Sequence, residues 1–284
     1  IKENTKVFFV ESLGNPKLDV LDLKIISKHA KSLKVPLIVD NTVATPALLN
    51  PIEHGANIVI HSLTKYINGN GTALGGAIID AGTFDWSSGK FPEFTNPSPG
   101  YHGLVYHDAL GPAAFIAKVR IEGLRDLGGA LSPFNAFQII QGLETLDIRM
   151  KKHSENALCL AKWLENRKEV NWVNYPGLSS SNFNLLSKKY LPKGQSGLIT
   201  FGVKGGFESA KTIADNTTVF SLLANIGDTK SLIIHPASTT HQQLSNEDQA
   251  LTGVTSDLIR LSIGLEDIED LKNDLEIAFS KIKS

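Results

Sequence analysis

Lys65 stands in the densest group of potentially reactive side chains in this sequence. Residues 58–71 read Ile-Val-Ile-His-Ser-Leu-Thr-Lys-Tyr-Ile-Asn-Gly-Asn-Gly, so an apolar stretch gives way to two hydroxyls, a lysine and two glycines. The Ser62 and Thr64 hydroxyls could donate hydrogen bonds to phosphate oxygens, and the Lys65 amine could form an imine with a carbonyl compound. A solvated lysine in a polar turn is the alternative interpretation, because short motifs also occur by chance.

Asp40 is the second candidate, because it ends the apolar segment Leu37–Val39 and is followed by Asn41 and Thr42. A carboxylate at the end of a buried strand is costly unless it has a partner. One interpretation is that Asp40 caps or forms the turn before Pro46. The other is that it pairs with a protonated pyridine nitrogen, and the protonated ring can then withdraw charge from a carbanion.

Short apolar segments alternate with helical periodicity in the first part of the chain, which predicts an α/β fold. The expected helix covers Leu18–Lys34, and the expected strands are Val7–Val10, Leu37–Val39, Ile58–Ile60 and Gly75–Asp80. Strands that are apolar throughout indicate a mostly parallel sheet buried on both faces. Ligands bind beyond the carboxyl ends of such strands, where this sequence places Glu11, Asp40, His61 and Ser62.

The second part of the chain predicts a smaller C-terminal α/β domain. A long irregular stretch at residues 81–112 contains several aromatic side chains, so we expect it to be ordered and functional. Helices are expected over Ala113–Leu127 and from Pro133 to about Leu164, and we place the domain boundary inside the second, between residues 145 and 146. The two domains are therefore residues 1–145 and 146–284. Strands follow at Val170–Tyr175, Leu198–Val203, Ser231–Ile234 and Leu258–Ile263, and a helix at Ile268–Ile282.

Composition narrows the class of protein. The 284 residues include 28 basic and 29 acidic side chains, and this balance gives no electrostatic reason to expect nucleic acid or an acidic membrane as a partner. No apolar run approaches the roughly 20 residues of a membrane-spanning helix. The single cysteine, Cys159, fits a reducing compartment, so we expect a cytoplasmic protein. His235 and His241 lack cysteine or carboxylate neighbours at ligand spacing, and we expect no metal site.

Three motifs together resemble the Cys/Met-metabolism pyridoxal phosphate enzymes, which have the fold type I, aminotransferase-like architecture. They are Glu-Ser-Leu-Gly-Asn-Pro at 11–16, Val-Asp-Asn-Thr at 39–42 and His-Ser-Leu-Thr-Lys-Tyr at 61–66. Further segments resemble the O-acetylhomoserine sulfhydrylase branch of that family. Among them are residues 100–106, 141–146, 227–232 and 235–241. Asn70 is a departure, because relatives usually carry histidine there.

The resemblance implies pyridoxal 5'-phosphate as cofactor and assigns residues to it. Lys65 is implied to be the imine-forming catalytic lysine, and Asp40 the partner of the pyridine nitrogen. Ser62 and Thr64 are implied to bind the phosphate, and Asn15 to lie near the ring hydroxyl.

The resemblance also implies how the substrate is bound. Arg260 matches the position that binds the substrate carboxylate, with Ser231 and Asn15 nearby. A guanidinium can bind a carboxylate through two parallel hydrogen bonds, which a lysine cannot. From local sequence alone, Arg260 could instead form an ion pair at a strand edge.

The implied reaction is a γ-replacement in methionine biosynthesis. O-acetyl-L-homoserine loses acetate, and sulfide or methanethiol takes its place, giving L-homocysteine or L-methionine, with Lys65 as the general base. Cystathionine γ-synthases and methionine γ-lyases share the cofactor chemistry and remain alternatives. Family members carry a segment before Val7 that this sequence lacks, so we expect a piece of a longer chain. A non-catalytic remnant without cofactor is the third alternative. Relatives are usually homotetramers built from dimers.

Overall fold

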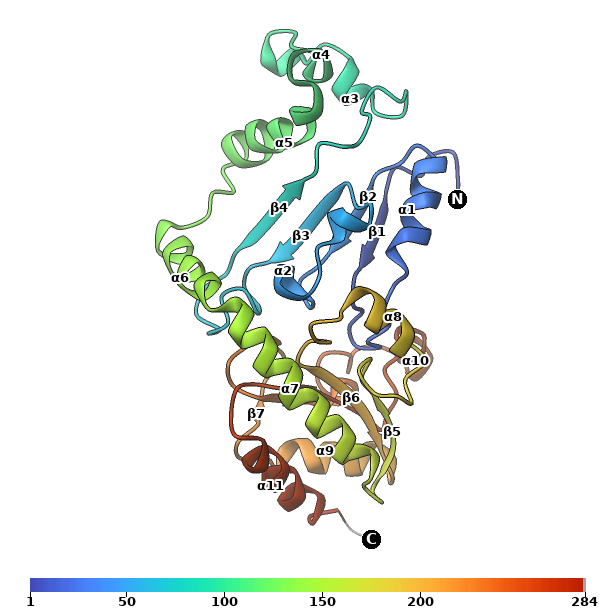
Figure 1. Ribbon diagram of the computed structural model, residues 1–284, viewed down its shortest axis with the longest axis vertical. Helices are drawn as coiled ribbons and strands as arrows, with labels where there is room; N and C mark the ends of the chain where they lie inside the picture. Colours follow the sequence, from blue (N-terminus) through green and yellow to red (C-terminus); the bar gives the residue numbers. More distant parts are fainter. Residues whose placement is uncertain (283–284) are drawn as a thin grey trace.

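The first half of the chain forms a four-stranded sheet. In the computed structural model, which describes residues 1–282, the strand order is β1 (Phe8–Glu11), β2 (Leu37–Asp40), β3 (Ile58–Ser62) and β4 (Gly76–Asp80) (Figure 1). The first three strands are parallel, whereas β4 runs antiparallel to β3. Residues 63–75 join these two strands without a crossover helix, and parallel neighbours need such a crossover. The segment that carries Lys65 is therefore the connection between two adjacent strands.

Helix α1 (Leu23–Ser32) packs on this sheet and is shorter than the predicted helix. The Asp22 side chain accepts a hydrogen bond from the Ile25 amide, which caps the first turn. Before it, Leu18 has a left-handed backbone (φ 57°) and is buried, so the chain turns here instead of continuing a helix. The short helix α2 (Thr45–Leu48) follows β2.

The other face of the sheet is only partly covered by the described residues. Aromatic residues of the 81–112 stretch form a core with Ile58, and this stretch contains the short helices α3 (Pro92–Thr95) and α4 (Tyr106–Leu110). Helix α5 (Ala114–Lys118) follows and continues as a π-helix over Val119–Asp126. Phe9 and Ile78 are 57% and 42% exposed, so the prediction of a sheet buried on both faces holds only in part here.

The second half of the chain forms a five-stranded sheet. Its order is β5 (Val170–Asn174), β6 (Leu198–Val203), β9 (Leu258–Ser262), β8 (Leu232–Ile234) and β7 (Ser221–Leu222). All six residues of β6 are buried, as expected of a central strand. Helices α9 (Gly206–Asp215) and α11 (Ile268–Phe279) contribute to the same core, while α8 (Asn184–Tyr190) and α10 (Asn246–Thr252) lie in the connections.

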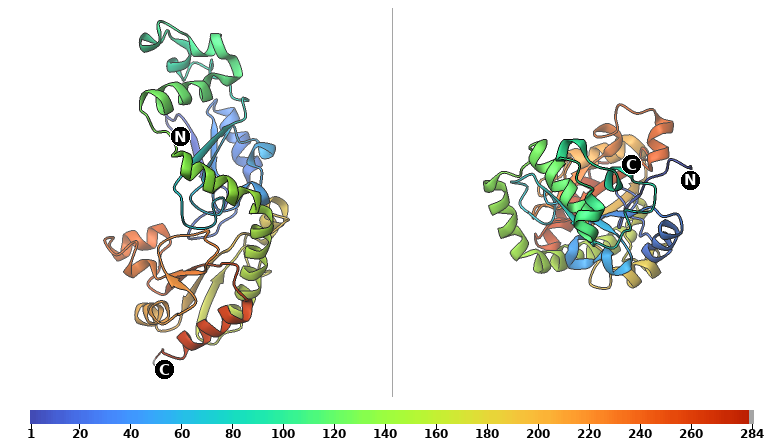
Figure 2. Two further views of the ribbon diagram at one scale, coloured as in Figure 1. Left: turned by 90° about the vertical axis from the view of Figure 1, so that its left-hand side faces the viewer. Right: turned by 90° about the horizontal axis from the view of Figure 1, so that it is seen from above.

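Two helices join the halves. The sequence predicts one helix from Pro133 to about Leu164, but the structure breaks it at Thr145 into α6 (Pro133–Glu144) and α7 (Leu146–Glu165). Helix α7 runs from the first sheet to the second (Figures 1 and 2). Its early residue Met150 belongs to the first core and its later residue Leu160 to the second. The boundary between residues 145 and 146 stays a prediction. Within residues 1–282, no helix is long and apolar enough to cross a membrane.

Candidate active site

Lys65 lies in the turn after β3 and is held there by its backbone. The Gly69 amide donates to the Lys65 carbonyl at 2.8 Å, and Gly69 has a positive φ of 76° that favours glycine. The next residue, Tyr66, is fully buried. The Lys65 side chain itself is half-buried, and its amine donates to Asn225 Oδ1 at 2.5 Å.

Arg260 reaches the same place from the second sheet. It lies on β9, and its Nη2 donates to the Asn225 carbonyl at 3.3 Å. Its Nη1 donates to Asn15 Oδ1 at 3.3 Å, in the loop after β1. Asn225 thus accepts from both cations, and the structure brings together the predicted residues Lys65, Arg260 and Asn15. Asn225 did not appear among the sequence candidates, because an asparagine in a loop carries no distinctive chemical pattern.

The electrostatics of this cluster favour an anionic ligand. Burial and, second, the positive charge of Arg260 lower the pKa of the Lys65 amine below its usual value. Neither Lys65 nor Arg260 forms a salt bridge with a carboxylate in the described part of the chain. Two cations held only by neutral oxygens leave their charge available to a bound carboxylate or phosphate.

Asp40 lies at the carboxyl edge of the first sheet, in register with Glu11 on the neighbouring strand. Its Oδ1 accepts from the Thr42 amide at 2.9 Å, so the local turn-forming role does occur. Its Oδ2 accepts no hydrogen bond from the described residues, and this oxygen is available to a further donor. Burial raises the pKa of Glu11, and the Asp40 charge adds to that rise.

The two predicted phosphate ligands differ in their surroundings. The Ser62 amide donates to Thr42 Oγ1 at 2.8 Å, while its hydroxyl contacts no partner among residues 1–282. The Thr64 hydroxyl donates to the Gly75 carbonyl at 3.3 Å and accepts from the Gly75 amide at 3.1 Å. Ser62 is therefore free to bind an anion, whereas Thr64 closes the base of the 64–75 loop.

Ser231 has a structural environment of its own. It is fully buried, and its hydroxyl donates to Glu266 Oε2 and accepts from the Gly264 amide, both at 2.8 Å. No hydrogen bond of the described residues joins Ser231 to the Lys65–Arg260 cluster, so its contact with substrate stays a prediction. The His235 ring nitrogens lie 2.9 Å from Ser238 Oγ and 2.8 Å from the Ser256 carbonyl.

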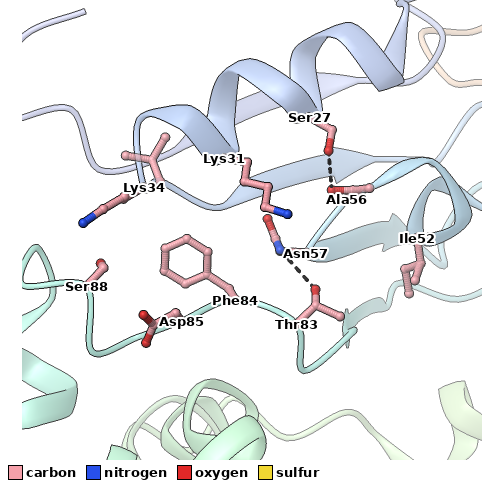
Figure 3. A pocket seen from close by; sticks show the side chains of 12 residues that line it. Ser27, Lys31, Lys34, Ile52, Ala56, Asn57, Thr83, Phe84, Asp85 and Ser88 are labelled. Carbon is pink, nitrogen blue, oxygen red and sulfur yellow. Dashed lines mark hydrogen bonds between the residues drawn. The ribbon is translucent and has the colours of Figure 1, made fainter.

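A cavity of about 410 Å³ lies elsewhere in the fold (Figure 3). It is bordered by Lys31 and Lys34 near the end of α1, and by Asn57, which donates to Thr83 Oγ1 at 3.1 Å. Asn57 directly precedes β3, so this cavity lies at the amino ends of the strands. It contains none of the predicted site residues, and ligands of parallel sheets bind at the opposite edge.

Comparisons with known proteins agree with the geometry. The family model described as Cys/Met metabolism PLP-dependent enzyme matches residues 1–280. O-acetyl-L-homoserine sulfhydrylase of Leptospira meyeri is 53% identical over 99% of this chain and 65% of its own length. Homocysteine synthase of Schizosaccharomyces pombe is 48% identical over 98% and 66%. The chain thus spans slightly less than two thirds of these relatives.

A solved structure shows the same fold. A Campylobacter jejuni protein described as an O-acetylhomoserine (thiol)-lyase, with N'-pyridoxyl-lysine-5'-monophosphate in its chain, superposes with a TM-score of 0.95 at 47% identity. The match covers 99% of this chain and 67% of that one. The fold type I architecture expected from the sequence is thereby confirmed.

Proposed function

Because the chain belongs to the family of Cys/Met metabolism PLP-dependent enzymes, we propose that the enzyme it is part of catalyses a γ-replacement on O-acetyl-L-homoserine. Sulfide or methanethiol displaces acetate, and the product is L-homocysteine or L-methionine. The names of the relatives from Leptospira meyeri and Schizosaccharomyces pombe support this substrate and this product. The activity is proposed for the complete enzyme, of which this chain matches about two thirds of the relatives' length.

The observation that carries the proposal is the shared contact of Lys65 and Arg260 with Asn225. An amino-acid substrate whose carboxylate binds Arg260 would have its α-carbon within reach of the Lys65 amine. The lowered pKa of that amine raises its neutral fraction, which is the form that accepts a proton. Lys65 then takes the α-proton at Nζ and can return it later at a neighbouring carbon.

The remaining residues fit pyridoxal phosphate as cofactor. When bound, the cofactor supplies an electron sink for negative charge at the substrate's α-carbon. The Asp40 Oδ2, which has no donor among the described residues, can accept a hydrogen bond from a protonated ring nitrogen. The Ser62 hydroxyl is free to donate to the phosphate, and Thr64 can join it if its bond to Gly75 is exchanged. Asn15, beside Arg260, is placed to contact the substrate or the ring hydroxyl.

The test is an assay of the full-length protein with O-acetyl-L-homoserine and either sulfide or cysteine. Homocysteine and acetate from the sulfide reaction support the proposal. Lys65→Ala should lower the rate by about 10²–10⁴-fold, which is the usual contribution of a general base. Lys204→Ala, at an exposed lysine whose amine makes no hydrogen bond to residues 1–282, is the matched control and should retain full activity. Cystathionine from cysteine, or release of ammonia and an oxoacid, would show a synthase or lyase instead. A protein that does not bind the cofactor would contradict the whole proposal.

We also propose a cytoplasmic homotetramer built from dimers. One face of α6 supports the assembly, since Phe134, Phe137 and Ile140 recur every three residues and are 66%, 56% and 58% exposed. Contiguous exposed apolar surface of this kind is typical of protein interfaces. Light scattering on the full-length protein tests it, and Phe137→Asp should shift the mass toward smaller species.

A further inference from the structure

Arg149 is a buried cation without a carboxylate partner. It lies on α7 and is only 8% exposed, and no salt bridge of the described residues includes it. Its Nη1 donates to the Tyr66 carbonyl at 2.6 Å. Its Nη2 donates to the carbonyls of Ile67 at 3.1 Å and Gly142 at 2.6 Å, and its Nε to Thr145 Oγ1 at 3.1 Å. Every contact of the guanidinium is therefore with a neutral oxygen.

This arrangement depends on the shape of the guanidinium as well as on its charge. Burial lowers the pKa of Arg149, because taking a cation out of water is costly when no anion compensates it. Here the compensation comes from carbonyl dipoles, including that of Gly142 near the carboxyl end of α6, where a helix favours positive charge. The three nitrogens of the planar fork hold three carbonyls and one hydroxyl at once, and the single nitrogen of a lysine, with three N–H groups, could not.

Two of these carbonyls belong to the residues directly after Lys65. The turn that they form is packed tightly against α6: a Cβ added at Gly142 would lie 2.3 Å from the Asn68 carbonyl oxygen. A Cβ at Gly69 would lie 2.3 Å from Arg149 Nη1. The turn is thus enclosed between the end of α6 and the Arg149 guanidinium.

The same face of α7 also contacts the strand that carries Arg260. His153, one turn after Arg149, packs edge-on against the Tyr66 ring at 5.1 Å, and its Nδ1 lies 2.6 Å from the Ile263 carbonyl just beyond β9. Arg149 and His153 therefore connect the turn that carries Lys65 with the backbone just beyond the strand that carries Arg260.

We propose that Arg149 is a positioning residue for Lys65: by binding the Tyr66 and Ile67 carbonyls, it fixes where the Lys65 amine stands relative to Arg260. This inference rests on the proposed function for its consequence in turnover. The effect of Arg149 on the environment of the Lys65 amine is independent of that function and can be measured without substrate or cofactor.

The first experiment substitutes Arg149→Lys, which keeps the charge and removes the fork. In the cofactor-free full-length protein, lysines are carbon-13 methylated and the Lys65 signal is identified by its absence in Lys65→Arg. We expect the pKa of Lys65 to rise toward its ordinary value in Arg149→Lys, because a loosened turn exposes the amine to water. A purely electrostatic role of Arg149 would leave that pKa unchanged, since the cation is retained.

The second experiment measures kinetics of the loaded enzyme. A displacement of about 1 Å can cost about 10²-fold in rate, so we expect kcat of Arg149→Lys to fall by that order. The KM for O-acetyl-L-homoserine should stay within about threefold, because Arg260 still binds the carboxylate. Added guanidinium ion should partly restore kcat in Arg149→Ala and leave the wild type unaffected.

Arg167→Lys is the matched control, because that guanidinium contacts the carboxylates of Glu169 and Glu276 and none of the turn. It should change neither the Lys65 pKa nor kcat. If Arg149→Lys does not fold, Thr145→Val removes a single bond to the guanidinium and should shift the Lys65 pKa in the same direction by less. An unchanged Lys65 pKa in the folded variants overturns the inference. A wild type without turnover overturns the proposed function alone, since the pKa measurement still shows whether Arg149 controls the environment of the Lys65 amine.

Discussion

Acidification should destabilise this protein through His153, a fully buried histidine on α7. Its Nδ1 lies 2.6 Å from the Ile263 carbonyl, so the proton of the neutral ring must be on Nδ1. The other nitrogen, Nε2, has no hydrogen-bond partner in the described residues. A second proton, on Nε2, would therefore be a buried donor with no acceptor and would give the ring a buried charge. Burial accordingly lowers the pKa of His153 from 6.5 to about 4.

The magnitude follows from the difference between the two pKa values. Between pH 6.5 and 4 the unfolded chain binds this proton and the folded chain does not, so the free energy of unfolding falls as the pH falls. The contribution is fully present above pH 6.5. At pH 5 about 2 kcal/mol of it should be lost, and the complete loss of about 3 kcal/mol should be reached below pH 4.

The assay is urea unfolding of the wild type and His153→Asn at pH 8, 7, 6 and 5. Asparagine can still donate to the Ile263 carbonyl but does not titrate in this range. Subtracting the two pH profiles removes the contributions of His61 and His235, whose pKa values burial also lowers. We expect the wild type to lose about 2 kcal/mol more than the variant between pH 8 and 5. A difference below about 0.5 kcal/mol would refute the reasoning, because His153 would then titrate alike in both states.

Three further substitutions follow from the described contacts. Asp274→Ala should lower the free energy of unfolding by about 3 kcal/mol, because this buried carboxylate accepts four hydrogen bonds from one neighbouring turn. Urea unfolding measures the loss, which should be smaller in Asp274→Asn because asparagine keeps one of the two acceptor oxygens. Ser231→Ala should cost about 1–3 kcal/mol, because Glu266 Oε2 loses its donor and the Gly264 amide loses its acceptor. A higher KM without this loss of stability would contradict the buried role described above. Arg260→Leu should raise the pKa of Lys65, which a titration of methylated lysines in the cofactor-free protein would detect; an unchanged pKa would show that Arg260 does not act on it.

The sequence predicts the strands well because their signals are local. Four apolar segments with polar ends are sufficient to place Asp40 and Ser62 at one edge of a sheet, and the structure has them there. The reversed direction of β4 agrees with the connection before it, since residues 63–75 contain Gly69, Gly71 and Gly75 and form no crossover helix. The break between α6 and α7 at Thr145 is harder to predict, because nothing in the local sequence interrupts the helical periodicity.

Long-range contacts explain what the sequence does not show. Asn225 becomes part of the site only because the loop before β8 meets the turn after β3, 160 residues apart in the chain. Arg149 has the spacing of an ordinary surface arginine, and its burial depends on how closely α6 approaches that turn. Ser231 is a candidate by resemblance, but its hydroxyl donates to Glu266 in the structure. The sequence does not indicate this bond, because the two residues are far apart in the chain.

Helix α7 supplies apolar side chains to both hydrophobic cores, Met150 to one and Leu160 to the other. A protein expressed as two separate pieces, divided before Leu146, would leave the first sheet with a hole in its interior and the second with a helix whose first turns have nothing to cover. The two halves are therefore expected to melt in a single transition, and neither should be obtainable as a stable fragment on its own.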